Sequence, residues 1–506
     1  MTDLKKGARL TLRVDRLSLG GDALGRAGDA VVFVPYGSPG DALEVELTET
    51  RKNFARGRLI RVLEPSPVRI DPPCPYHFQA PPSHPPPHGG RTEVGGVGQS
   101  APTPHPHLPR QGGKEYEGSL YCGGCSWQHM NYEFQLDAKR QLVQETLERL
   151  GGVRDVTVKP TLGMKDPWRY RNKVQQPVGW DACLPARQGR RIISGFYAPF
   201  SHDIVPIEDC RVQSELSVRI VNRVRALLEQ FQLLAYDEEK HTGWIRHLWV
   251  RTAQNKALLV FVTRTDDFPH QNEVLEALAQ DIPELVGVHQ NINPGKTNVI
   301  LGRHWRKCGG ADYLEERLGA LRFHLSPGSF FQVNARQTEV LYEQVKALAG
   351  KGGTLIDLYC GVGGIALWLA PQFRGVTGVD EVKSAVADAQ NNAKLNGITN
   401  TRFVADSAER FLSKYHGNAG FQGDLTVVLD PPRAGCDPRV LHALSRLRPS
   451  NLIYVSCDPG TLARDLGILG KAGFRPRDVH PVDLFPHTPH IETVVRLVPL
   501  APRRAH

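Results

Sequence analysis

A thiol and a carboxylate near the C-terminal end, Cys457 and Glu492, are the residues whose types best suit covalent chemistry. Cys457 follows an apolar, strand-like run and precedes Asp458-Pro459, a pair typical of a helix N-cap and first helical position. Because a helix N-terminus favours negative charge, the sequence predicts a lowered pKa and a reactive thiolate at Cys457. A thiolate nucleophile and a carboxylate base together indicate covalent catalysis, although a structural cysteine after a strand has the same local pattern.

A glycine-rich turn at residues 357–364 could hold a nucleotide-type cofactor. A strand-like run ends there and a helix follows, and the glycines at Gly361, Gly363 and Gly364 let the backbone approach a ligand. Asp380 closes the next predicted strand, close to the spacing at which an acid binds ribose hydroxyls. This turn by itself does not distinguish a nicotinamide cofactor from S-adenosylmethionine.

The segment Asp430-Pro431-Pro432-Arg433 comes after the fourth strand-like run of the same region. The prolines remove backbone donors and fix the turn, which directs the Asp430 carboxylate into the cleft at the strand ends. The segment resembles the Asp-Pro-Pro motif of many adenosylmethionine-dependent methyltransferases, and this favours that cofactor. An ordinary strand-ending turn is the alternative.

Four cysteines are candidate metal ligands. Cys122-Gly-Gly-Cys125 supplies two sulfurs from one turn, while Cys74 and Cys210 come from distant parts of the sequence. Four thiolates suit either tetrahedral zinc or a [4Fe–4S] cluster, and the spacing alone does not decide between them. We expect Cys183 and Cys308 to be structural.

The elements that must position these residues fall into three predicted regions. Residues 8–68 contain five short strand-like runs separated by glycine turns, which is typical of an oligonucleotide-binding β-barrel or of a purely structural one. Residues 168–320 mix strand-like runs with helices, which indicates an α+β domain. After about residue 321 strands and helices alternate, and this predicts a doubly wound, Rossmann-like parallel sheet.

The 506-residue chain has 40% hydrophobic and 23% charged residues, which indicates a globular protein of two or three domains. Its formal charge of +9 and pI near 9.1 favour a polyanionic partner, most simply a nucleic acid. No apolar run approaches a membrane span and the first residues lack a signal sequence, so we expect a cytoplasmic protein with no membrane partner. Nine cysteines in that compartment are not expected to form disulfides. Residues 77–114 are rich in Pro, His and Gly and are expected to be a disordered insertion.

In their order and spacing, these C-terminal motifs resemble the RNA uracil-5 methyltransferase family. The resemblance implies transfer of a methyl group from S-adenosylmethionine to carbon 5 of a uridine, with Cys457 adding to carbon 6 and Glu492 removing the carbon-5 proton. It also implies that Asp430 binds the uracil edge, and we expect His487 and His490 to order the turn that carries Glu492. The implied cofactor-binding positions are Gln332, Tyr359, Gly361, Gly363, Gly364, Asp380, Asp406 and Asp430. At Gly364 the family often has asparagine.

Segments such as Ala55-Arg-Gly-Arg58 look like a TRAM domain, an RNA-binding module. Family members with this domain carry an iron–sulfur cluster, and the resemblance assigns a [4Fe–4S] cluster to the cysteines Cys74, Cys122, Cys125 and Cys210. The gap after Cys74 is longer here than in the family, because the 77–114 insertion falls inside it.

The predicted architecture is therefore multi-domain α/β. It comprises an OB-like TRAM barrel over residues 1–70, an α+β central domain with the iron–sulfur cysteines over 71–320, and a Rossmann-like methyltransferase domain over 321–506. TRAM and cluster together resemble the 23S rRNA enzymes more than the tRNA enzyme, so 23S rRNA is the expected partner, with no obligate protein partner evident. The alternatives are a tRNA uracil-5 methyltransferase, a non-catalytic RNA-binding assembly factor, and a radical adenosylmethionine methylthiotransferase, whose Cys-x3-Cys-x2-Cys triad is absent from the sequence.

Overall fold

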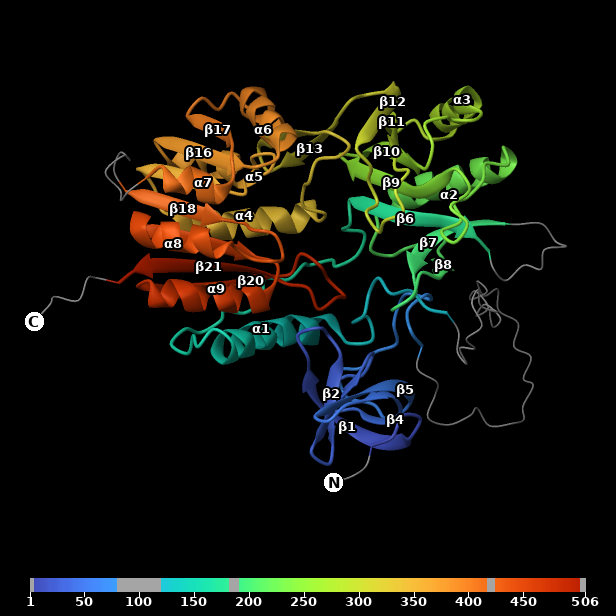
Figure 1. The fold of residues 1–506 in the computed structure, drawn as a ribbon, viewed down its shortest axis with the longest axis horizontal. Helices are drawn as coiled ribbons and strands as arrows, with labels where there is room; N and C mark the ends of the chain where they lie inside the picture. Colours follow the sequence, from blue (N-terminus) through green and yellow to red (C-terminus); the bar gives the residue numbers. More distant parts are fainter. Residues whose placement is uncertain (1–3, 80–119, 182–190, 416–423, 501–506) are drawn as a thin grey trace, which may run out of the picture. The chain divides into compact units, whose positions relative to one another are not determined.

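The computed structural model describes residues 4–79, 120–181, 191–415 and 424–500 of the chain (Figure 1). The chain divides into two compact units, each built from several stretches of sequence. Unit 1 comprises Met1–Gln135, Pro177–Glu208 and His487–Pro489, and unit 2 comprises Leu136–Gln176, Asp209–Pro486 and His490–His506. The predicted insertion, apart from residues 77–79, lies outside the described residues, as does Cys183. The three-domain division stays a prediction.

Unit 1 contains a closed five-stranded barrel, which confirms the predicted architecture of this region. Its strands are β1 (Arg9–Leu17), β2 (Ala23–Ala27), β3 (Ala30–Val34), β4 (Ala42–Thr50) and β5 (Phe54–Glu64), in the order β1-β2-β3-β5-β4. Alternate residues point inward: in β4, Leu43, Val45 and Leu47 are buried, while the residues between them are more exposed. The buried Asp41 carboxylate pairs with Arg69 at 2.6 Å and so ties the start of β4 to the segment after β5.

The middle of the chain forms both strands and helices, in agreement with the α+β domain predicted for residues 168–320. Its elements are α1 (Tyr132–Arg149), β6 (Lys173–Trp180), β7 (Ile192–Tyr197), β8 (Ile204–Pro206), α2 (Glu215–Gln230), β9 (Ile245–Ala253), β10 (Lys256–Thr263), α3 (Gln271–Asp281), β11 (Leu285–Ile292) and β12 (His304–Gly310). Within unit 1, β7 pairs antiparallel with β6 and with β8. Within unit 2 the strand order is β12-β11-β10-β9-β6, and β12 is the edge strand.

The rest of unit 2 is a doubly wound sheet, as predicted. Its elements are β13 (Leu314–Leu318), β14 (Leu321–Leu325), α4 (Ala335–Ala349), β15 (Thr354–Leu358), α5 (Gly364–Leu369), β16 (Gly375–Asp380), α6 (Lys383–Leu395), β17 (Thr401–Ala405), α7 (Ala408–Ser413), β18 (Leu425–Leu429), α8 (Pro438–Leu447), β19 (Asn451–Ser456), α9 (Pro459–Lys471), β20 (Phe474–Val482) and β21 (Glu492–Pro499). The sheet order is β17-β16-β15-β18-β19-β21-β20. The strands from β17 to β19 are parallel, whereas β21 runs antiparallel to both neighbours, a feature that the sequence did not predict.

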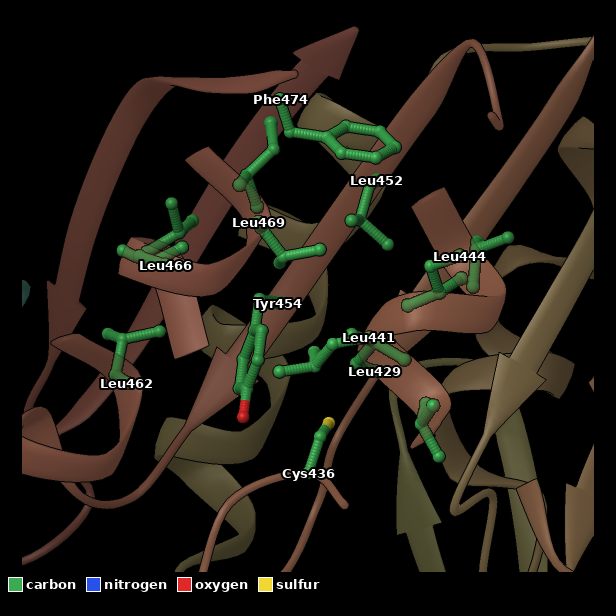
Figure 2. Packing of buried hydrophobic residues seen from close by; sticks show 14 of the residues in the cluster. Leu429, Cys436, Leu441, Leu444, Leu452, Tyr454, Leu462, Leu466, Leu469 and Phe474 are labelled. Atoms are coloured by element: carbon green, nitrogen blue, oxygen red, sulfur yellow. The ribbon is translucent and has the colours of Figure 1, made fainter. Parts of the chain in front are cut away.

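Each face of this sheet buries its own core. Along β18, Leu425, Val427 and Leu429 pack on the side of α1, α7, α8 and α9, whereas Val428 packs on the side of α4, α5 and α6. Figure 2 shows the first core, where leucines of α8 and α9 enclose Tyr454 of β19. Burial on both faces explains why the parallel strands are nearly continuous apolar runs. Within the described residues, no helix is both long enough and apolar enough to cross a membrane.

Candidate active site

The carboxyl ends of the parallel strands bring most predicted site residues to one edge of the C-terminal sheet. Tyr359 follows β15, Asp380 ends β16, Asp430 follows β18 and Cys457 follows β19. From β15 the chain proceeds through β16 and β17 on one side, while β18 and β19 lie on the other. Doubly wound sheets bind their ligands in the crevice at such a change of direction. Topology alone therefore places the cofactor turn beside the reactive groups.

Cys457 and Glu492 face each other across neighbouring strands. In the antiparallel pair β19–β21, Ser456 lies opposite Thr493, so continuing this register by one residue puts Cys457 opposite Glu492. The Cβ atoms of such a directly opposed pair are about 4.5–5.5 Å apart. The Glu492 side chain is buried, and Cys457 is partly accessible. A ligand that touches the thiol therefore also meets the carboxyl group.

The helix after Cys457 begins as predicted. The Asp458 side chain accepts a hydrogen bond from the Thr461 N–H at 2.8 Å, and Pro459 occupies the first helical position of α9. The helix N-terminus thus lies directly after the thiol.

The predicted lowering of the Cys457 pKa is nevertheless wrong for the free site. Burial raises the pKa of this thiol to about 12, with further increases from the charges of Glu492 and Asp430, while the Arg433 charge acts in the opposite direction. A helix terminus typically contributes ~0.3–1 kcal/mol at exposed sites. That is too little to offset desolvation of a thiolate between two carboxyl groups. The sequence revealed the helix but not these two neighbours.

The two carboxyl groups are themselves perturbed. Burial raises the pKa of Asp430 to about 7, so this group changes its protonation state near neutral pH. Burial, reinforced by the Asp430 charge, raises the pKa of Glu492 well above its ordinary value. At pH 7 the free site therefore holds a neutral thiol, ionisation of Glu492 is disfavoured, and Asp430 is the group whose charge is poised to change.

Helix α9 holds the loop that carries Asp430. Thr461 donates to the Arg433 carbonyl at 3.1 Å, and Arg464 donates to the Ala434 carbonyl at 2.9 Å. Because α9 begins at Pro459, two residues after Cys457, one helix supports both the nucleophile and the Asp-Pro-Pro loop.

A buried carboxylate completes this support. Asp465 accepts hydrogen bonds from the Cys436 N–H at 2.8 Å and from the Tyr454 hydroxyl at 2.6 Å. In Figure 2 the Tyr454 hydroxyl points towards Cys436, at the end of the loop. Gly435 has φ +76°, and a Cβ there would lie 2.7 Å from an Asp465 oxygen. Asp465 has no signature in the sequence, since its role depends on contacts with Cys436 and Tyr454, which are 29 and 11 residues away.

The glycine-rich turn has the geometry of a ligand-binding loop. Gly361 and Gly363 have φ of +52° and +86°, which other residues adopt only with strain, and a Cβ on Gly361 would meet open space. Tyr359, which is not glycine, is also left-handed at φ +66°. The Gly361 N–H donates to the Asp380 carboxylate at 2.9 Å, so Asp380 orders the turn from the next strand.

Gly364 departs from the family for a reason that the structure shows. A Cβ at this position would collide with the hydroxyl of the buried Tyr342 from α4. Tyr342 thus occupies the space into which an asparagine at Gly364 would project.

Asp357 is a site residue that sequence analysis missed. Its side chain is buried at the end of β15, and its Oδ2 accepts the Ala366 N–H at 2.9 Å. Its Oδ1 is buried with no hydrogen-bond partner among the described residues. Burial and the neighbouring Asp430 charge raise the pKa of Asp357 well above its ordinary value. An orphaned oxygen beside an open glycine turn fits a bound ligand that supplies the missing donor.

Two further predicted cofactor-binding residues, Gln332 and Asp406, lie in different segments of unit 2. Gln332 is buried just before α4, and its carbonyl accepts from Asn172 Nδ2 at 3.3 Å. Asp406 follows β17, where its side chain is already paired with Lys414 at 2.7 Å and Arg410 at 2.9 Å. These ion pairs lower the pKa of Asp406 and keep it charged.

Comparison with known proteins identifies the family. A family model described as tRNA (Uracil-5-)-methyltransferase matches residues 299–499, and one described as TRAM domain matches residues 3–60. An uncharacterized RNA methyltransferase of Halalkalibacterium halodurans is 36% identical over 498 residues, which cover 98% of each chain. The chain belongs to the RNA uracil-5 methyltransferase family. An uncharacterized RNA methyltransferase of Bacillus cereus is 38% identical over 92% of this chain and 91% of its own.

A solved structure shares the fold of the described residues. The Pyrococcus abyssi tRNA (uracil-54, C5)-methyltransferase, crystallised with S-adenosyl-L-homocysteine, superimposes with a TM-score of 0.69. The match covers 96% of this chain and 99% of that chain at 24% identity. Membership of the family confirms that the protein is an RNA (uracil-5-)-methyltransferase, and the TRAM match falls on the barrel of unit 1. The non-catalytic alternative is thereby disfavoured.

The four predicted cluster cysteines do not form a metal site in the described part of the chain. No group of three or more His, Cys, Asp or Glu side chains there is placed to hold a metal ion. Unit 1 contains Cys74, Cys122 and Cys125, and unit 2 contains Cys210. Amide donors do reach two of the sulfurs: the Gly124 N–H donates to Cys122 at 3.3 Å, and two backbone groups hydrogen-bond Cys210. Such donors stabilise thiolates, so the donor chemistry fits a cluster although the arrangement does not show one.

The two histidines before Glu492 lie in structured backbone. The His487 N–H donates to Gln135 at 3.0 Å and its carbonyl accepts the Trp127 N–H at 3.0 Å, all within unit 1. Burial lowers the pKa of His490 to about 4, so this ring is neutral. The His487 backbone is therefore anchored within unit 1, and the expectation that both histidines order the turn before β21 stays a prediction.

Proposed function

We propose that this protein methylates carbon 5 of a uridine in RNA through a covalent adduct with Cys457. The observation that supports this most directly is the opposition of Cys457 and Glu492 at the end of β19, with Asp430 on the adjacent strand. A nucleophile, a base and a third carboxyl group at one strand edge suit a reaction that needs addition, proton removal and elimination.

Addition supplies the reactivity that carbon 5 lacks. The Cys457 Sγ forms a bond to carbon 6 of the uracil, and the electron pair of the 5,6 double bond moves into an enolate that makes carbon 5 nucleophilic. Carbon 5 would then take the methyl group as the bond between that methyl and the sulfonium sulfur breaks, and S-adenosyl-L-homocysteine would leave. Glu492, as a carboxylate, removes the carbon-5 proton, and the resulting electron pair restores the double bond as the carbon–sulfur bond breaks. The thiolate is regenerated for the next cycle.

Asp430 has the protonation behaviour that binding of the uracil edge needs. With a pKa raised to about 7, its neutral form donates a hydrogen bond to a uracil carbonyl oxygen, where charge develops as the enolate forms. The Asp430 N–H donates a hydrogen bond to the Leu358 carbonyl at 3.3 Å, and this bond and the contacts from α9 hold the loop in place. Asp430 therefore orients the base and stabilises the developing negative charge.

S-adenosylmethionine supplies an electrophilic methyl group on a sulfonium centre. The residues that would hold it are Gln332, Tyr359, Gly361, Gly363, Asp380 and Asp406, with Asp357 as an addition from its orphaned oxygen. The open turn at Gly361 and the acid at the end of β16 fit a nucleoside-containing ligand. At Gly364 only the backbone is available for such a contact.

We further propose 23S rRNA as the RNA substrate, in preference to tRNA. The support is the combination of a TRAM barrel with the four cysteines, which resembles the rRNA enzymes of the family. The target base must be single-stranded or flipped out to reach a buried site.

We also propose a [4Fe–4S] cluster on Cys74, Cys122, Cys125 and Cys210. The support is the four-thiol donor set and the amide hydrogen bonds to Cys122 and Cys210. Iron and sulfide analysis of anaerobically purified protein tests it. A wild-type protein without iron, folded and active, would overturn the cluster and leave the methylation proposal intact.

Trapping with 5-fluorouridine tests the covalent mechanism. Fluorine at carbon 5 cannot leave as a proton, so the methylated adduct should persist through denaturation on gels with wild-type protein and vanish with Cys457→Ala. Fragments of 23S rRNA and tRNA transcripts, each containing 5-fluorouridine, identify the substrate. An adduct with tRNA alone reverses the substrate preference, and no adduct with any RNA overturns the mechanism.

A second variant separates the two chemical steps. Glu492→Gln keeps the shape of the side chain but cannot take a proton, so it should accumulate a methylated Cys457 adduct on ordinary uridine RNA. Rapid turnover by Glu492→Gln would assign the base elsewhere.

A further inference from the structure

Exposed aromatic side chains are concentrated in one stretch of unit 2. Four large hydrophobic residues between positions 299 and 330 are exposed, namely Val299, Trp305, Tyr313 and Phe330. The stretch connects the central sheet to the methyltransferase sheet and contains β12, β13, β14 and the loop before α4. Side chains of this size are normally buried, so their clustering at the surface indicates a binding role.

Strand β12 is an unusual edge strand. It pairs only through β11, at the end of the sheet order, and its residues from His304 to Lys307 are exposed on both faces. Trp305 is 39% exposed and is flanked in sequence by Arg303, Arg306 and Lys307. An edge strand this basic resists pairing with another strand, and it attracts anions.

Nearby charges leave the strand positive. Lys307 is paired with Asp312 at 2.9 Å, while Arg306 hydrogen-bonds Gln271 at 3.3 Å and Cys308 and has no acidic partner among the described residues. Arg303 has no acidic partner within the described residues. Arg303, two residues before Trp305, and Arg306, on the opposite face of the strand from Trp305, can therefore both bind an anionic ligand.

The loop that leads to Gln332 lies against this strand. A Cβ on Gly328 would lie 3.1 Å from the Trp305 ring, so the glycine lets the indole contact the loop backbone. Two residues later Phe330 is 65% exposed, with the Lys173 ammonium 5.5 Å from its ring centre. Trp305 on β12 and Phe330 on the loop are thus two accessible aromatic surfaces close to the same loop, and the Lys173 ammonium lies over the Phe330 ring.

A buried arginine fixes this loop. Arg251 of β9 donates to the Ser329 carbonyl at 2.5 Å and to the Ser326 carbonyl at 3.3 Å. Ser326 in turn donates to Asp388 of α6 at 3.0 Å. The loop is therefore tied both to β9 of the central sheet and to helix α6, which limits the entropy lost when a ligand binds.

We propose that β12 and the loop from Ser326 to Phe330 bind single-stranded RNA flanking the target uridine. Bases stack on Trp305 and Phe330, and phosphates bind Arg303 and Arg306. Stacking with adjacent cations is how proteins hold single strands without reading their sequence. The proposal rests on the proposed function, because it assigns a path to that substrate, and it places RNA beside the loop that carries Gln332.

Binding is measured in the Cys457→Ala background, so that affinity does not depend on chemistry. The probes are a 23S rRNA fragment with single-stranded flanks and the same target as a trinucleotide, with dissociation constants taken over a salt series. Trp305→Ala should weaken binding of the long fragment about tenfold. Arg303→Ala with Arg306→Ala should weaken it further and reduce the salt slope by ~2. Neither change should alter trinucleotide binding.

Matched controls come from the same unit. Arg402→Ala removes an exposed arginine from β17, the edge strand of the other sheet, and Leu234→Ala removes an exposed apolar side chain. Both should bind the long fragment as tightly as the parent. The proposal is overturned if the β12 variants keep the parent's RNA affinity, which is the result that a protein-binding surface would give. It is also overturned if the control variants lose as much affinity as the β12 variants. Selective loss of binding in this background, combined with no 5-fluorouridine adduct in the protein that keeps Cys457, would instead refute the proposed function and retain the RNA surface.

Discussion

Replacing the Asp430 carboxyl with an amide should stabilise the free protein at alkaline pH while it removes methylation. Burial raises the pKa of Asp430 from 3.8 to about 7, so the folded protein keeps a proton that the unfolded chain has released. From pH 3.8 to 7 the folded state binds more protons, and the free energy of unfolding therefore falls as the pH rises. Above pH 7 the loss is complete and amounts to ~4 kcal/mol, at about 1.36 kcal/mol per pKa unit.

The Asp430→Asn side chain cannot ionise, so its contribution to stability is independent of pH. Between pH 5 and pH 8 the wild-type protein should lose ~2–3 kcal/mol that the variant keeps. For a unit of this size the loss corresponds to a relative change in Tm of about 3 °C. Glu492 and Asp357 titrate in both proteins, so most of their contribution cancels in the comparison.

Thermal unfolding of the ligand-free proteins at pH 5 and pH 8 measures this difference. Asp437→Asn is the matched control, because it alters an exposed carboxyl just after the same loop, whose pKa Arg439 lowers to about 2. That control should gain nothing at high pH. The Tm difference between Asp430→Asn and wild type should therefore change between pH 5 and pH 8. An equal difference at both pH values would refute the claim that ionisation of Asp430 lowers the stability of the folded protein.

Three further variants and a labelling experiment test the site. Alkylation of Cys457, followed by peptide mass spectrometry, should be slow at pH 7 and faster in the Asp430→Asn variant, since the Asp430 charge raises the thiol pKa; equal rates would contradict this. Asp465→Asn should slow adduct formation at least tenfold without changing RNA affinity, because it displaces the Asp-Pro-Pro loop. Each broken buried hydrogen bond costs ~1–3 kcal/mol. Asp437→Asn is the control for this variant. Gly364→Ala should weaken cofactor binding measured by calorimetry, and adding Tyr342→Phe should restore part of it; no rescue would mean that the clash is not the cause.

The strands were predictable where burial on both faces made them continuous apolar runs. Thr354–Leu358 and Leu425–Leu429 occur where the sequence indicated them, bounded by glycine or by Asp-Pro-Pro. β20 was missed because it is an edge strand with prolines at Pro476 and Pro481, which lowers its apolar character and its resemblance to a strand. Missing β20 hid the antiparallel β21 as well, and with it the register that opposes Glu492 to the thiol.

The chemistry of the site was predictable only where it is local. The N-cap at Asp458 and the left-handed glycines follow from short-range rules, and both are present. Asp465 supports the Asp-Pro-Pro loop through contacts that have no signature in the sequence. Asp357 lies in the predicted glycine-rich segment, but its buried, unpaired oxygen is visible only in the fold. The Cys457 pKa was misjudged for the same reason, since burial of the thiol, together with two carboxyl groups from other strands, outweighs the adjacent helix terminus.

The protonation states of the free site argue that substrate binding must activate the nucleophile. With a pKa of about 12, the Cys457 thiol is ionised in about one molecule in 10⁵ at pH 7. The Asp430 charge contributes to this by raising the pKa of both Cys457 and Glu492. If Asp430 takes up a proton and its neutral carboxyl group donates a hydrogen bond to a uracil carbonyl, the Asp430 charge is removed. Ionisation of Cys457 and Glu492 then becomes easier.

This linkage predicts two different pH profiles for one thiol. The rate of adduct formation at saturating RNA and cofactor should reach its plateau at a lower pH than the alkylation rate of Cys457 in the free protein, by at least one pH unit. In the Asp430→Asn variant the alkylation profile should move to lower pH, because the opposing charge is gone. Coincident profiles in the wild-type protein would show that substrate binding does not change the pKa of the Cys457 thiol. Another group would then have to activate the thiol.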